Sequence, residues 1–420
     1  AYSSLFKNTF GPIEVASAAP NTNFQFTMGQ KTKLFGKDFG SIFALTYNNS
    51  YRRTPALRQD FAGDDKVFEF NDEQYSRNVL WGALWNLSYK LNNNNKISFR
   101  NMFNVNTEDQ VTVREGQDIA ASGLDRKAYA IFYNQNLLYT GQLIGEHLFE
   151  KAKNLKVKWV LGYSDITRDI PDFRRLRYNR VPSANNENPY IAFLTTNASP
   201  NDAGRFYSNL DESVYSGSVD FSLPLDIKGK KSTLKFGYYY QSRVRDFNVR
   251  VLGNVINSTT YFNPDLLRLG IGDIFNPTNF MDSTGFSIAE STNKSDSYDA
   301  SSSLNSGYAM LDMKLTVRLR AVFGVRVEAF SQNVYAESNS NVPTDITRSN
   351  VDVLPSLNLA YELSQKSNLR FAASQTLSRP EFRELAPFSF FDFNNFVEIV
   401  GNSELQRAKI TNLDLRYELF

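Results

Sequence analysis

Residues 78–91 read NVLWGALWNLSYKL, and this stretch decides the fold class. Apolar side chains occupy every second position from Val79 to Leu91, while polar or small side chains fill most of the positions between them. A period of two places the two sets on opposite faces of an extended strand. The stretch therefore predicts a long β-strand with one continuous apolar face.

The same alternation recurs along the whole chain. Most of the segments exceed ten residues, whereas strands in soluble proteins usually have about five or six. A strand that crosses a bilayer at a tilt needs about 9–11 residues. We predict about 13 strands from this periodicity, near residues 22–35, 39–52, 76–91, 96–109, 127–140, 155–167, 212–226, 232–249, 304–316, 318–336, 352–364, 367–379 and 409–420.

The connections between these segments alternate between short and long. Short turns are expected at 36–38, 92–95, 228–231 and 365–367, with a longer link at 141–154 in the same set. Long loops are expected at 53–75, 110–126, 168–211, 250–303, 337–351 and 380–408. Sorting of this kind is typical of an outer-membrane β-barrel, whose long loops lie outside the cell. A soluble sandwich or propeller would fit the mean hydropathy of −0.41 but gives no reason for the sorting.

Composition excludes several classes of protein. The absence of cysteine rules out disulfide frameworks and zinc fingers, and a single histidine, His147, rules out a multi-histidine metal site. The 46 basic and 44 acidic side chains leave a net charge of +2, so we expect no nucleic-acid partner. We also find no cofactor motif and no catalytic constellation. His147 is expected in a turn at the short-turn end, with a structural role.

A membrane-spanning sheet cannot leave an open edge in lipid, because its N–H and C=O groups would be unpaired. Bacterial single-chain barrels normally contain an even number of strands. About 13 strands is an odd number. We therefore expect residues 1–420 to form a partial all-β, antiparallel, up-and-down transmembrane β-barrel domain, completed by strands outside this stretch.

The last part of the sequence carries a family signature. It reads TLSRPEFRELAPFSFFDF from Thr376, then FVEIVGNSELQRAKITNLDLRYELF from Phe396. This stretch resembles the late barrel region of TonB-dependent outer-membrane transporters, in the variant found in Bacteroidetes-type receptors. The matching positions are Arg379, Pro380, Phe382, Glu384, Leu385 and Pro387, followed by Gly401, Asn402, Leu405, Asn412, Asp414, Arg416 and Glu418.

The resemblance implies a barrel of about 22 strands in the bacterial outer membrane. It implies active import of a nutrient such as a siderophore, glycan or peptide, with no covalent chemistry. TonB and its inner-membrane energy complex would act through a plug domain, which we do not find in residues 1–420, and a surface lipoprotein is a further candidate partner. Three alternatives stay open: a passive substrate-specific porin, the barrel of a secretion or surface-assembly complex, and a barrel hydrolase that uses His147.

Candidate substrate contacts fall in two groups. Arg243, Arg245, Arg320 and Arg326 lie on the polar phase of their strands and could contact an anionic substrate in the lumen. The alternative is a hydrated wall that pairs with a plug domain. The second group, Arg177, Tyr178 and Tyr261, lies in the expected long loops, where recognition residues often occur. For residues 379–384 we expect a structural role, holding a loop to the wall or plug.

Overall fold

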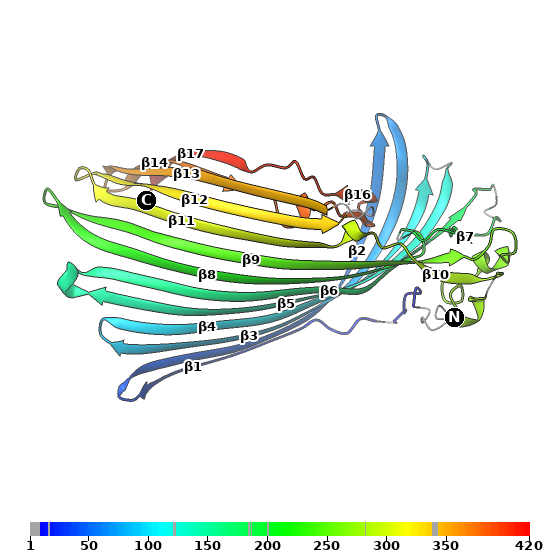
Figure 1. Ribbon diagram of the computed structural model, residues 1–420, viewed down its shortest axis with the longest axis horizontal. Coiled ribbons are helices and arrows are strands. Elements are labelled where there is room, and N and C mark those ends of the chain that lie inside the picture. The colour runs from blue at the N-terminus through cyan, green and yellow to red at the C-terminus, as the bar shows by residue number, and fades with distance from the viewer. Residues whose placement is uncertain are drawn as a thin grey trace.

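The sheet follows the chain almost strand by strand. The structure is a computed structural model that describes residues 9–15, 17–120, 123–183, 185, 187–199, 201–281, 283–337 and 343–420. In these residues a 15-stranded antiparallel sheet forms, in which two short strands, β7 and β10, lie off the main path (Figure 1). The remaining thirteen strands pair in chain order from β1 to β17. The predicted up-and-down arrangement and the predicted number of long strands are confirmed.

The main path comprises β1 (Thr22–Leu34), β2 (Lys37–Ala62), β3 (Asp65–Asn92), β4 (Asn95–Asp118), β5 (Leu124–Phe149), β6 (Leu155–Arg180), β8 (Gly204–Ile227), β9 (Lys230–Ile256), β11 (Tyr298–Lys314), β12 (Leu319–Glu337), β13 (Pro343–Ser364), β14 (Ser367–Ser378) and β17 (Ala408–Leu419). The shorter elements are β7 (Ile191–Ala192), β10 (Phe286–Glu290), β15 (Ser389–Asp392), β16 (Val397–Val400), α1 (Phe382–Leu385) and the 3-10 turns Glu150–Ala152, Pro264–Arg268, Pro277–Asn279 and Lys294–Asp296.

Several expected loops are continuations of strands. Most of the expected loop 53–75 is a β2–β3 hairpin that projects beyond its neighbours (Figure 1), and β4 and β6 run on to Asp118 and Arg180. These boundaries were wrong because the alternation becomes short or irregular in these segments, while backbone pairing continues. An exposed Arg53–Glu73 ion pair (2.7 Å) across the hairpin illustrates such a strand. Of the expected loop 337–351, residues 338–342 lie outside the described residues.

His147 lies within β5 and not in a turn. Its Nε2 accepts a hydrogen bond from Trp159 Nε1 at 3.0 Å on β6, and its Nδ1 lies 2.7 Å from Asn95 Oδ1. The indole can only donate, so Nε2 must be the unprotonated nitrogen and Nδ1 the donor to Asn95. Both ring nitrogens are used in cross-strand bonds, which is a structural arrangement.

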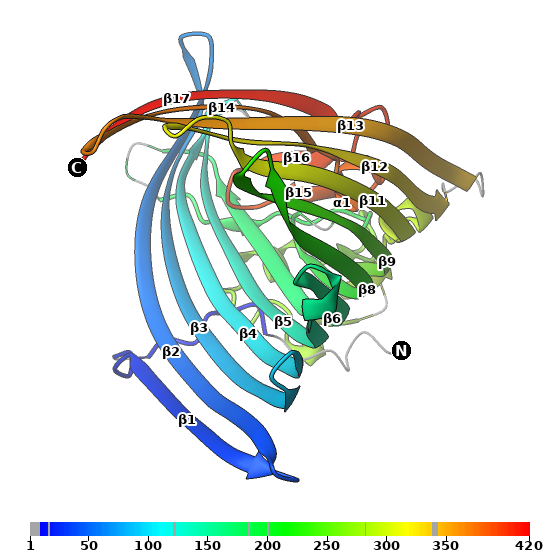
Figure 2. The same cartoon turned by 90° about the vertical axis from the view of Figure 1, so that its left-hand side faces the viewer.

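Figure 2 shows the sheet as an arc, with α1, β15 and β16 on its concave side. Along the described path, β1 and β17 each pair on one side only. The convex side exposes large apolar side chains from successive strands, including Trp81, Trp85, Phe323 and Leu415. Rings also meet across strands on this side, as for Tyr163 and Tyr215 with centroids 5.1 Å apart. An apolar outer band with aromatic contacts is the lipid-facing surface that a membrane barrel needs.

Within the described residues, no helix is both long enough and apolar enough to span a membrane.

The long connections pack together at one end of the sheet. The described residues within 181–203 and 257–297 contribute to a buried apolar core, to which the segment before β1 adds Phe10, 2% exposed. Phe10 contacts Phe275 with ring centroids 4.8 Å apart. These connections therefore form a folded cap at the long-loop end of the sheet.

Val325 on the convex face of β12 tests the expected lipid contact. Arginine there should reduce the free energy of unfolding in lipid vesicles by about 2–4 kcal/mol, because the charge would lie in hydrocarbon. Val181 in the loop region is 64% exposed and supplies the matched control, Val181→Arg. Equal stability of the two variants in urea unfolding would contradict the assignment of the convex face.

Candidate functional site

The most informative feature of the concave face is the segment that joins β14 to β17. We call residues 379–407 the inner segment. It contains α1 and the β15–β16 hairpin, and it lies against the inside of the arc (Figure 2). Its two ends contact β12 and β13, while the hairpin tip reaches β2 and β3 on the opposite side of the arc. The inner segment thus bridges the concave face.

A charge network holds the two ends of the inner segment. Glu328 on β12 accepts from Arg379 Nη2 at 2.7 Å and from Arg326 Nε at 2.6 Å. Asp352 on β13, 1% exposed, accepts from Arg407 Nε at 2.9 Å and lies 3.2 Å from Lys409 Nζ. Each carboxylate therefore serves at least two cations. Pro380 and Leu405 line a small cavity of about 310 Å³ beside this network.

Phe382 anchors α1 to the wall. It is 1% exposed, and the guanidinium carbons of Arg243 and Arg245 both lie 5.0 Å from its ring centroid. Arg245 Nε also donates to Glu212 at 2.6 Å, and Arg243 reaches Glu212 at 3.2 Å and Glu381 at 3.4 Å. A buried aromatic ring beside two guanidinium groups combines apolar burial with cation–π attraction. This arrangement fixes α1 against β8 and β9.

The family signature forms the turn structure at the base of the hairpin. Glu384 accepts a hydrogen bond from the Glu381 backbone N–H at 2.8 Å, and its own carbonyl accepts from Asn402 N at 2.6 Å. Gly401 packs on the backbone of α1, where an added Cβ would lie 1.8 Å from Ala386 O. Glycine is the residue that permits this close approach.

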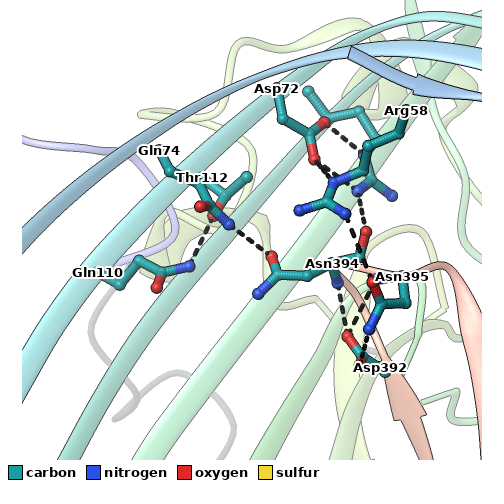
Figure 3. Close-up of polar contacts among 9 residues, drawn as sticks. Arg58, Asp72, Gln74, Gln110, Thr112, Asp392, Asn394 and Asn395 are labelled. Atoms are coloured by element: carbon teal, nitrogen blue, oxygen red, sulfur yellow. Dashed lines mark hydrogen bonds and ion pairs between the residues drawn. The ribbon is translucent and has the colours of Figure 1, made fainter. Parts of the chain in front are cut away.

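The hairpin tip docks on the far wall. Figure 3 shows Asn394 and Asn395 facing Gln74 and Arg58, which project from β3 and β2. Gln74 Nε2 donates to Asn394 Oδ1 at 3.0 Å, and Arg114 Nη2 donates to the Asn394 carbonyl at 3.1 Å. Each end of the bridge therefore has its own polar attachment.

A buried ion pair supports that docking site. Asp72 and Arg114 are 1% and 0% exposed and form two hydrogen bonds of 2.7 Å. Arg58 Nε also donates to Asp72 at 2.7 Å, and the Arg114 guanidinium lies 4.5 Å from the Phe393 ring centroid. Two-point pairing between a guanidinium and a carboxylate fixes geometry as well as charge.

A cavity of about 980 Å³ lies between the inner segment and the wall formed by β4, β5, β6, β8 and β9. This volume is at the upper end of the range of small-molecule sites. Its arginines are Arg168, Arg175, Arg245 and Arg383, and its aromatic residues include Phe132, Phe173, Phe206, Phe247, Phe388 and Phe390.

Of the four strand arginines predicted to line a ligand path, three contact the inner segment or its attachment network: Arg243, Arg245 and Arg326. Only Arg245 borders the large cavity. Arg320 lies near the short-turn end of β12, where its guanidinium pairs with Asp312 at 2.6 Å. The structure therefore does not gather these four side chains in one place.

The three predicted loop residues are also dispersed. Arg177 Nε lies 2.7 Å from Asp202, and Tyr178, 5% exposed, donates to the Leu269 carbonyl at 3.1 Å. Both are tied into the folded cap. Tyr261 is 69% exposed and remains accessible to an external ligand.

The sequence places Asp72, Arg114 and Arg175 in expected loops, whereas the structure places them on β3, β4 and β6. One signal was present, since Val111 and Val113 alternate with Gln110, Thr112 and Arg114. Arg175 gave no such signal. Two β6 residues lie between Ile170 and Phe173 where β8 has one, and this bulge shifts the inward phase of β6 from even to odd positions.

Comparison with known proteins agrees with this geometry. Residues 175–420 match the sequence profile of the Outer membrane protein beta-barrel family. Among curated proteins, none matches the chain in sequence.

Two solved structures share the fold. The siderophore receptor PiuA from Acinetobacter baumannii is similar with a TM-score of 0.50 and 10% identity, over 96% of this chain and 55% of PiuA. The ferric-catecholate import receptor Fiu from E. coli K12, in its closed form, is similar with a TM-score of 0.50 and 11% identity, over 94% of this chain and 55% of Fiu. The chain thus spans about half the length of either receptor.

Gly401→Ala tests the packing of the inner segment. The new Cβ would collide with the Ala386 carbonyl, so we expect a loss of about 1–3 kcal/mol and faster proteolysis within residues 379–407. Gly270→Ala is the matched control, because an added Cβ there meets nothing within 4 Å. Proteolysis at the wild-type rate in Gly401→Ala would refute the described packing.

Asp72→Asn tests the buried pair beneath the hairpin tip. Removing the negative charge leaves Arg114 buried without an ionic partner, which should cost about 3–5 kcal/mol of unfolding free energy. Asp265→Asn breaks an exposed Asp265–Arg268 pair (2.8 Å) and should cost at most about 1 kcal/mol. Urea unfolding in lipid vesicles measures both, and similar losses would show that the buried pair carries no special weight.

Proposed function

The chain belongs to the Outer membrane protein beta-barrel family and lies in the bacterial outer membrane, and we propose that it forms the barrel wall of an active, TonB-dependent import receptor. The cargo we propose is a nutrient such as a siderophore, a glycan or a peptide. TonB and its inner-membrane energy complex would act through a plug domain outside residues 1–420.

The observation that carries this proposal is the inner segment. A passive pore needs a water-filled path through the barrel, whereas here a chain segment bridges the concave face and is attached at both ends. Its attachments include the ion pairs of Arg379 with Glu328 and Arg407 with Asp352, at 2.7 and 2.9 Å. A wall that is obstructed in this way suits a receptor that binds its cargo before admitting it.

The cavity beside the inner segment supports binding over chemistry. It is lined by arginine and phenylalanine side chains, which suit recognition of a ligand. His147, the only histidine, lies in a cross-strand hydrogen-bond chain with Trp159 and Asn95. We therefore propose a transporter and not a barrel hydrolase.

Uptake in cells tests the proposal directly. A strain that lacks the gene is compared with the same strain carrying the full-length protein, on radiolabelled iron chelates, oligosaccharides and peptides. We expect one cargo class to accumulate only when the protein is present and the proton-motive force is intact. Accumulation that persists after a protonophore collapses that force would favour a passive porin, and equal uptake of every cargo by the two strains would refute import.

A further inference from the structure

One buried arginine in the cavity has no ion pair among the described residues. Arg114, Arg126, Arg175 and Arg205 are the fully buried arginines of the described residues, each at most 5% exposed. Three of them pair with carboxylates: Arg114 with Asp72, Arg126 with Asp118 and Arg205 with Asp172, all at 2.6–2.7 Å. Within the same described part of the chain, Arg175 has no carboxylate within 4 Å.

The partners of Arg175 leave part of its guanidinium free. Nη1 donates to the Phe391 carbonyl at 3.2 Å, and Nε is buried without a hydrogen-bond partner among the described residues. The side chain is 3% exposed and lines the cavity of about 980 Å³. A buried cation without a counter-ion is costly, so a position that retains one is a candidate for binding an anion.

A second cation faces the same space from the inner segment. The guanidinium carbon of Arg383 lies 3.6 Å from the Phe390 ring centroid, and no ion pair of Arg383 occurs in the described residues. Burial lowers the pKa of the Arg383 guanidinium below its ordinary value. Arg175 on β6 and Arg383 on α1 therefore both line the cavity.

The acidic groups that line the cavity are engaged elsewhere. Asp392 accepts from the backbone N–H groups of Asn394 and Asn395 at 2.9 and 3.1 Å, and Asp296 accepts from Asn293 N at 2.7 Å. Glu398 accepts from the Ser389 hydroxyl. The fourth, Glu108, interacts electrostatically with Arg168. None of these carboxylates comes within ion-pair distance of Arg175 in the described structure.

The rest of the cavity offers flat apolar surfaces. Phe132 and Phe173 meet edge to face at 5.3 Å between centroids, and Phe173 lies 4.8 Å from the Arg175 guanidinium. On the other wall, Phe388 and Phe390 are stacked at 6.1 Å. Ring faces beside a cation suit a ligand that is itself planar and carries negative charge at one end.

We propose that this cavity binds a small organic anion with a planar ring, whose anionic group is held by Arg175 and Arg383 and whose ring packs against Phe173 and Phe390. The inference deepens the proposed function, because it rests on the cavity being the cargo site of an import receptor and names the class of cargo. The bond from Arg175 Nη1 to the Phe391 carbonyl fixes the guanidinium plane at the wall of the cavity.

Ligand binding to the full-length receptor in detergent tests the proposal. The probe is 2-naphthoate; 2-naphthylmethanol supplies the ring without the charge, and acetate supplies the charge without the ring. Isothermal titration calorimetry should give binding of 2-naphthoate at least about tenfold tighter than of either control. Comparable affinity for 2-naphthylmethanol or for acetate would overturn the proposal, as would no binding of 2-naphthoate.

Two variants locate the site. Arg175→Gln should weaken 2-naphthoate binding at least about tenfold, since a charge-assisted hydrogen bond is lost. Arg383 lies outside the sheet, and Arg383→Gln should also weaken 2-naphthoate binding. This second variant keeps the test decisive if Arg175→Gln fails to fold. Arg268→Gln is the matched control on an exposed loop and should bind as the wild type does. Unchanged binding in Arg383→Gln or a folded Arg175→Gln would overturn the assignment.

Binding in detergent needs no energy source, so the result is separable from transport. Loss of energised uptake with 2-naphthoate binding intact would refute the proposed import and leave the site standing. Energised uptake of another cargo class without 2-naphthoate binding would refute the site and leave import standing.

Discussion

Backbone pairing across the sheet is the constraint on which the rest of this structure depends. In lipid, an N–H or C=O group that lacks a protein partner has no water to replace it, so each strand needs a neighbour on both sides. The thirteen strands of the main path meet this requirement in simple chain order, except at the outer edges of β1 and β17. Long strands and short turns follow from it. Alternation then leaves one face of the sheet for lipid and the other for polar side chains.

The polar face uses its charges in a repeated arrangement. Asp72, Glu212, Glu328 and Asp352 are all buried, and each accepts from at least two cationic side chains. Most of these cations lie on or beside the inner segment. Buried ion pairs add little net stability compared with apolar packing, but they penalise any alternative placement that would leave a charge alone. The network therefore serves mainly to give the inner segment one position across the arc.

The sequence was sufficient for the overall fold because a period of two is a direct consequence of strand geometry. It was insufficient where that signal ends. Residues 53–75 carry many polar side chains on both faces of the β2–β3 hairpin, and the alternation of Phe68 and Phe70 with Glu69 and Asn71 is too short to reveal the pairing that continues there. The position of the inner segment is even harder to predict from the sequence, because the contact of Asn394 with Gln74 joins positions that are distant in the sequence. The signature residues Phe382 and Gly401 were recognised, but their contacts with Arg243 and Ala386 became visible only in three dimensions.

Arg175 was hard to place from the sequence for two reasons: the periodic signal ends in its segment, and its contact with the inner segment joins distant positions. Counting inward positions of β6 from Lys156 and Lys158 gives even numbers, which would turn Arg175 outward. The extra residue between Ile170 and Phe173 reverses that phase, and Pro171 lies within it, as proline in a sheet commonly does at a bulge. A straight β6 would direct this cation away from the cavity. The bulge instead turns it toward the inner segment, in a wall where the other buried arginines have carboxylate partners, and so places at the cavity a buried cation that has no ion pair among the described residues.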